Sequence, residues 1–109
     1  MNKAKYSLSV AVAHFFDRAV YAIEDEPEYH TAEEAIKNTC FPLTLIEETD
    51  SENAKTLTKA IRGISMKVLH IIEHEKVTVK DKNRAVDYLI AANGLAEVLA
   101  EHFRKDNWK

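Results

Sequence analysis

The segment LTKAIRGISMKVLHII, residues 57–72, carries the clearest structural signal in the chain. Its large aliphatic residues recur at intervals of three and four positions, which places them on one face of an α-helix. They form an apolar stripe about 100° wide, made of Leu57, Ile61, Ile64, Val68, Ile71 and Ile72. A stripe of this kind has to be buried against other helices. The segment therefore predicts a helix that ends near Glu75 and belongs to an all-α bundle.

Two other segments share this periodicity and predict the first and last helices, at residues 7–23 and 79–104. The main apolar arc of the last helix holds Ala85, Tyr88, Leu89, Ala92, Leu95, Ala96, Leu99 and Phe103. The connection that precedes it is only about three residues long, and so short a connection makes neighbouring helices antiparallel. The dipeptide Asn93-Gly94 is typical of hairpin turns, but the helical periodicity continues through it. We therefore expect Gly94 to lie inside the helix.

Three capping boxes mark expected helix starts. In such a box a threonine hydroxyl accepts from the amide three residues later, and an acidic side chain reaches back. Boxes begin at Thr31, Thr49 and Thr78. Pro42 lacks an amide hydrogen and crowds the carbonyl four residues earlier, so the second helix should be kinked or broken near Pro42. We predict one domain, residues 1–109, folded as a compact bundle of about four helices whose last two form an antiparallel hairpin.

Composition limits the class of protein. Hydrophobic residues make up 46% and charged residues 30%, which is typical of a folded globular domain. Cys40 is the single cysteine, so an internal disulfide is impossible, and its apolar neighbours predict a small buried side chain. Charged residues interrupt the apolar stretch at residues 8–23, which argues against a signal peptide or a membrane span. We therefore expect a cytoplasmic protein with no membrane partner.

The charge distribution argues against nucleic-acid binding. Residues 1–53 hold four Lys or Arg and eleven Asp or Glu, whereas residues 54–109 hold eleven and seven. The isoelectric point is about 5.9, and the basic residues are mixed with acidic ones. The two glycines are isolated, so there is no glycine-rich phosphate loop. Because no catalytic set can be identified either, we expect a protein that is not an enzyme and needs no cofactor.

A histidine pair is the sharpest chemical motif. His70 and His74 are four residues apart on one helix face, where they can share a metal ion, and Glu73 is adjacent. The spacing matches the H-x-x-E-H pattern of inverted zinc peptidases, which are much larger proteins. His102 is the most plausible further ligand. The alternative is that both histidines are simply solvated surface residues.

Surplus apolar residues point to association. Met66 and Leu69 fall outside the stripe of residues 57–72, Ile90 and Val98 fall outside the arc of the last helix, and Trp108 lies in the tail. Exposed apolar patches usually mark association surfaces, and two-fold dimers are the commonest oligomers. We therefore predict a homodimer that serves as a non-enzymatic protein-protein interaction module, such as a regulator, adaptor or inhibitor. The alternatives are a metal-binding bundle using His70 and His74, and a monomer whose first half covers these residues.

Overall fold

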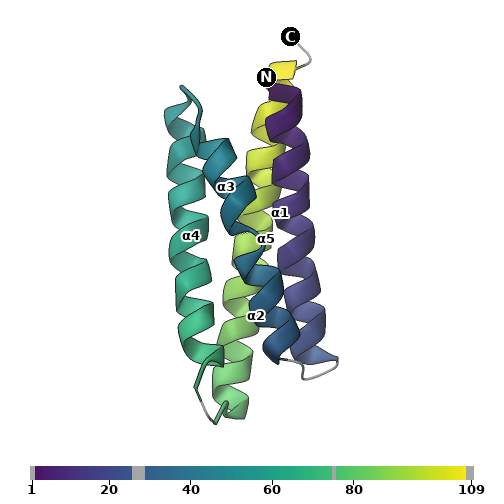
Figure 1. Cartoon of the computed structure of the whole chain (residues 1–109), viewed down its shortest axis with the longest axis vertical. Helices are drawn as coiled ribbons and strands as arrows, with labels where there is room; N and C mark the ends of the chain where they lie inside the picture. The colour runs from purple at the N-terminus through teal and green to yellow at the C-terminus, as the bar shows by residue number, and fades with distance from the viewer. Residues whose placement is uncertain (1, 26–28, 75, 108–109) are drawn as a thin grey trace.

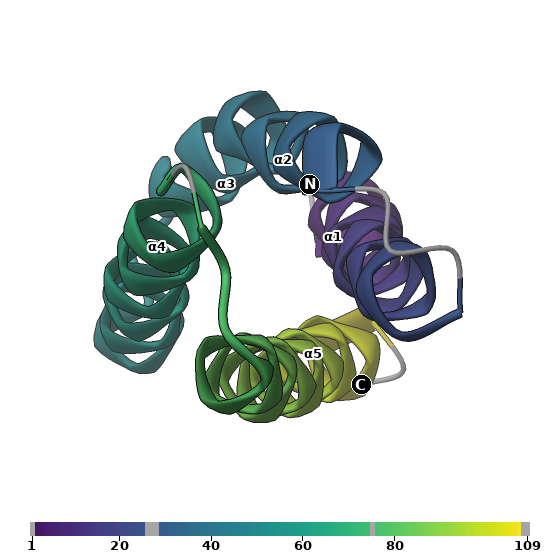
Figure 2. The same ribbon diagram turned by 90° about the horizontal axis from the view of Figure 1, so that it is seen from below.

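Five helical segments make up this computed structural model, which describes residues 2–25, 29–74 and 76–107. They are α1 (Asn2–Glu24), α2 (Tyr29–Lys37), α3 (Cys40–Glu47), α4 (Glu52–Ile72) and α5 (Val79–Asn107). With α2 and α3 counted as one bent helix, neighbouring helices run in opposite directions. The start of α1 and the end of α5 therefore lie at the same end of the bundle (Figure 1). Seen along the long axis, α1, α2–α3, α4 and α5 form a closed ring of four layers (Figure 2). The predicted all-α bundle with an antiparallel hairpin of the last two helices is confirmed.

The second layer is bent as the sequence predicts. Taken together, α2 and α3 form one layer bent by 22°. The break lies at Asn38 and Thr39, where the Thr39 hydroxyl donates to the Ile36 carbonyl at 2.6 Å. The carbonyl four residues before Pro42 belongs to Asn38, and this is the group that the proline ring crowds. Pro42 itself lies in the first turn of α3, where a missing amide hydrogen removes no internal helix bond.

Of the three predicted helix starts, one is confirmed, one is displaced and one is wrong. The Thr78 box is confirmed: Asp81 N donates to Thr78 Oγ1 at 3.1 Å, and Thr78 N donates to Asp81 Oδ2 at 3.3 Å. The Thr49 prediction is displaced by two residues, because Ser51 is the N-cap of α4 and accepts from Ala54 N at 3.2 Å. The Thr31 prediction is wrong. Here α2 already begins at Tyr29, so Thr31 lies inside the helix.

The core lies on the axis of the ring and includes most of the predicted stripe residues, whereas Leu57, Ile64, Tyr88 and Leu95 are only partly buried. In α5 it contains Ala85, Leu89, Ala92, Ala96, Leu99 and Phe103, and in α4 it contains Ile61, Val68, Ile71 and Ile72. Burial of these side chains is the main force that holds the bundle together. The most extensive helix pairing joins α1 to α5, and Asn93 Nδ2 donates to the Ala13 carbonyl across it at 2.8 Å. None of the described helices has a stretch long and apolar enough to cross a bilayer.

Candidate functional site

The outward face of α5 carries an apolar patch around a glycine, which we call the Gly94 patch: Ile90, Gly94 and Val98. The three residues are spaced by four and therefore share one face of the helix. Ile90 is 56% exposed and Val98 is 55% exposed. A Cβ atom added at Gly94 would meet nothing within 4 Å. Packing within the protomer therefore gives no reason for a glycine that costs a helix about 1 kcal/mol relative to alanine.

A second apolar feature is concave and lies between α2–α3 and α4; we call it the Met66 groove. Its volume is about 390 Å³. The walls are mainly the side chains of Ile36, Leu43, Met66 and Leu69. Met66 is 66% exposed, while Leu69 is half-buried against the core. The groove therefore combines an accessible mouth with an apolar interior.

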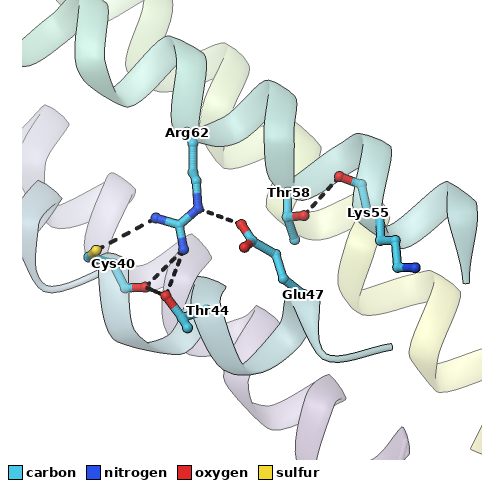
Figure 3. A network of polar contacts seen from close by, with 6 residues as sticks. All are labelled: Cys40, Thr44, Glu47, Lys55, Thr58 and Arg62. Carbon is cyan, nitrogen blue, oxygen red and sulfur yellow. Dashed lines mark hydrogen bonds and ion pairs between the residues drawn. The ribbon is translucent and has the colours of Figure 1, made fainter. Parts of the chain in front are cut away.

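Arg62 is one of the residues that line the Met66 groove. Its side chain reaches from α4 to α3 (Figure 3). Its Nε donates to Glu47, and Nη2 donates to Thr44 Oγ1 at 2.8 Å and to the Cys40 carbonyl at 3.3 Å. Nη1 contacts Cys40 Sγ at 3.6 Å, and sulfur is a weak acceptor. The hydrogen bond to Glu47 raises the pKa of Arg62. The Arg62 guanidinium therefore stays protonated, with the Glu47 carboxylate as its counter-ion.

Two other polar side chains in the groove lining differ in their surroundings. Lys37 pairs with Glu33 at 2.9 Å on the exposed surface. Ser65 is 7% exposed, and its Oγ has no hydrogen-bond partner among the described residues. An unpaired buried hydroxyl is costly, because it loses its hydrogen bonds to water without replacement. Among the residues of the lining, Ser65 therefore carries the buried side-chain oxygen that has no hydrogen-bond partner in the part of the chain that the structure describes.

The predicted association residues do not form one surface. Met66 and Leu69 line the groove with residues of α2 and α3, and no residue of α5 takes part in that lining. Ile90 and Val98 lie on α5, which packs against α1 and α4. Trp108 lies outside the described residues. The five predicted residues therefore divide into a groove pair, a patch pair and a tail residue.

The histidine pair is present but incomplete as a metal site. His70 and His74 are exposed, with ring centroids 5.1 Å apart. His102 is not near them: its Nε2 lies 3.0 Å from Ser51 Oγ, at the start of α4, whereas His70 is in the last turn. The length of that helix, about 30 Å, separates the two places. Among the residues that the structure describes, no group of three His, Cys, Asp or Glu side chains could hold a metal ion.

The expectation that Cys40 is buried is wrong, because the thiol is exposed. Cys40 is the first residue of α3, just after the bend, and it lines the Met66 groove.

Two residues of the groove, Arg62 and Ser65, were not predicted from the sequence. Arg62 sits beside the apolar stripe of its helix, but its partners are 15 to 22 residues away in the sequence. No local pattern could have revealed those contacts.

Comparison with known proteins adds no relative: no protein-family model, curated protein or solved structure gives a significant match.

Proposed function

We propose that this protein is a small helical interaction module that self-associates through the Gly94 patch and acts by binding, without catalysis. The observation that carries the proposal is the open space around Gly94, between two exposed β-branched side chains. A glycine without an internal reason is explained if another backbone approaches there, because only glycine lacks a side chain. Burial of the two neighbours would supply the driving force.

The patch is suited to a second copy of the same chain. An aliphatic residue lies four positions before Gly94 and another lies four positions after it. In an antiparallel pair of α5 helices, Ile90 of each subunit would therefore contact Val98 of the partner subunit. A two-fold axis would pass near Gly94, as a symmetric dimer interface requires. Because the patch is small, we expect a weak or transient dimer.

Acidic residues border the patch and influence the association. Asp87 and Glu101 lie seven positions before and after Gly94, two helical turns away on the same face. The antiparallel arrangement would bring Asp87 near Glu101 of the partner subunit, whose charge is offset only in part by the exposed pair with Arg104. Like charges repel, and salt screens that repulsion over about 10 Å at 0.1 M. Self-association should therefore become tighter as the ionic strength rises.

Equilibrium sedimentation over a wide concentration range tests the proposal. The mass should rise from the monomer value of 12.4 kDa towards twice that value. Ile90→Glu should abolish the rise, because it places a charge in the contact. Met66→Glu is the matched control: its side chain is at least as exposed but lies in the groove, so the dimer should persist. A constant monomer mass, or equal effects of both variants, would contradict the proposal.

The biological role that fits such a module is that of a regulator, adaptor or inhibitor whose activity depends on its association state. We place it in the cytoplasm as part of this proposal. The exposed thiol of Cys40 supports that placement, because free surface thiols persist in reducing compartments.

A further inference from the structure

We propose that the Met66 groove binds a small amphipathic carboxylate, an aliphatic chain with one anionic head of the medium-chain fatty-acid kind. The proposal does not depend on self-association through α5. It rests on three properties of the groove: its volume, its charge and the unpaired hydroxyl of Ser65.

Volume defines the size of the occupant. A cavity of about 390 Å³ holds roughly a dozen non-hydrogen atoms, if each takes about the 30 Å³ share of a liquid water molecule. Ligand sites typically begin near this volume and are mostly apolar. An aliphatic chain of eight to ten carbons would match the space between Ile36, Leu43 and Leu69.

Charge defines the head group. The two charged side chains that line the groove, Lys37 and Arg62, are both cationic, and the carboxylates that pair with them, Glu33 and Glu47, lie outside the lining. Arg62 also has donor capacity left. Its Nε and Nη2 already donate to oxygen atoms, but Nη1 has only the thiol of Cys40, 3.6 Å away. A ligand carboxylate would give Nη1 a far better acceptor than sulfur.

The hydroxyl of Ser65 is a second, independent observation that favours a polar ligand in the groove. It follows Arg62 by three residues on α4, a spacing that makes their side chains neighbours on the helix surface. Its hydroxyl is buried in the groove lining and has no partner in the described structure. A carboxylate held by Arg62 has a second oxygen, which can accept from the Ser65 hydroxyl. The exposed and flexible side chain of Met66 also lines the groove and can adapt to a ligand chain.

Titration followed by amide NMR spectroscopy tests the proposal, with sodium octanoate as the probe. Octanoate should shift the resonances of Ile36, Leu43 and Met66. Octan-1-ol has the same chain without the charge and should bind about tenfold more weakly, since hydrogen bonds to charged groups are among the stronger ones. Ser65→Ala should weaken octanoate binding by a similar factor while leaving octanol binding unchanged. Because it removes an unpaired hydroxyl, this variant should fold at least as stably as the wild type.

Two variants locate the site. Cys40→Trp should block the mouth of the groove and abolish binding of octanoate. Phe41→Trp is the matched control on the same helix turn, since Phe41 is 68% exposed and does not line the groove.

Octanoate should also slow alkylation of the wild-type Cys40 thiol. Equal binding of octanoate and octanol, equal behaviour of the two tryptophan variants, or no binding below the solubility limit would each overturn the proposal. Shifts centred on Ile90 and Val98 would also overturn it, because they would show general adsorption to apolar surface.

Discussion

The Gly94 patch and the Met66 groove each carry an exposed apolar side chain, yet they differ in shape and charge. The patch belongs to one helix, is bordered by Asp87 and Glu101, and is centred on a glycine at which an added Cβ would meet nothing within 4 Å. The groove lies between helices, has cationic side chains in its lining, and includes the unpaired hydroxyl of Ser65. Excess apolar surface can therefore serve two purposes in one small bundle. An outward helix face suits a second helix, whereas a concave site with an unpaired polar group suits a small ligand.

The largest effect is expected at the groove, where Arg62 joins α3 to α4. Arg62→Ala should lower the free energy of unfolding by about 2 kcal/mol, because it removes hydrogen bonds that involve a charged group and the packing of the alkyl chain. Chemical denaturation measures this change. Arg104→Ala is the control, since Arg104 pairs with Glu101 three residues earlier on the exposed surface, and such pairs contribute about 0–1 kcal/mol. If both variants lost the same free energy of unfolding, Arg62 would stabilise the fold no more than an exposed ion pair does, which would contradict its role in joining α3 to α4.

The next largest effect is expected on dimer affinity, at the acidic residues that border the Gly94 patch. Asp87→Lys should tighten the dimer about tenfold at low salt, because two new pairs with Glu101 of the partner subunit replace two repulsions. The gain should shrink as salt is added. A parallel arrangement would instead bring the two new lysines together and weaken the dimer. Sedimentation of this variant at two ionic strengths therefore determines the orientation of the α5 helices.

The two glycines form a natural matched pair. A Cβ at Gly63 or at Gly94 would meet nothing within 4 Å, so each change to alanine should stabilise the isolated protomer by up to about 1 kcal/mol. Their effects on association should differ. Gly94→Ala should weaken the dimer, because the added methyl group separates the two helices, whereas Gly63→Ala should leave it unchanged. Denaturation at low concentration and sedimentation at high concentration separate the two effects.

The smallest effect concerns the start of the helix that carries the patch. Hydrogen bonds from the side chain and backbone of Thr78 lower the pKa of Asp81. A lowered pKa in the folded state stabilises the fold above the unfolded value near 3.9, and this contribution disappears as the pH falls towards the folded value. Between pH 6 and pH 3 the wild type should therefore lose slightly more stability than Asp81→Asn. A larger loss in the variant would contradict the capping role.

The fold was predictable because its signals are local. The apolar stripe of residues 57–72, the Thr78 box and the crowding caused by Pro42 each act within a few residues, and each agrees with the structure. The errors at helix starts arose where several polar residues compete for the same cap. Thr49 and Ser51 both accept backbone amides, and Ser51 is the one that caps α4.

The candidate sites were predictable only in part. Periodicity identified Met66, Ile90 and Val98 as outward apolar residues, and all three are exposed. It could not show that they belong to two separate surfaces, because that depends on which side of α4 faces α3 and which faces α5. The exposure of Cys40 and the unpaired hydroxyl of Ser65 likewise depend on how the bent α2–α3 layer meets α4. Such contacts between distant segments leave no local sequence pattern.

Disulfide trapping between copies tests the central claim most directly. In a Cys40→Ser background, Gly94→Cys should form a covalent dimer rapidly under mild oxidation, because a two-fold axis near position 94 brings the two thiols within bonding distance. A Cβ at position 63 also meets nothing within 4 Å, and Gly63→Cys in the same background should form no covalent dimer. Rapid trapping at 94 and not at 63 is the predicted result. Equal rates at both positions, or no trapping at 94, would contradict the assignment of the Gly94 patch as the self-association surface.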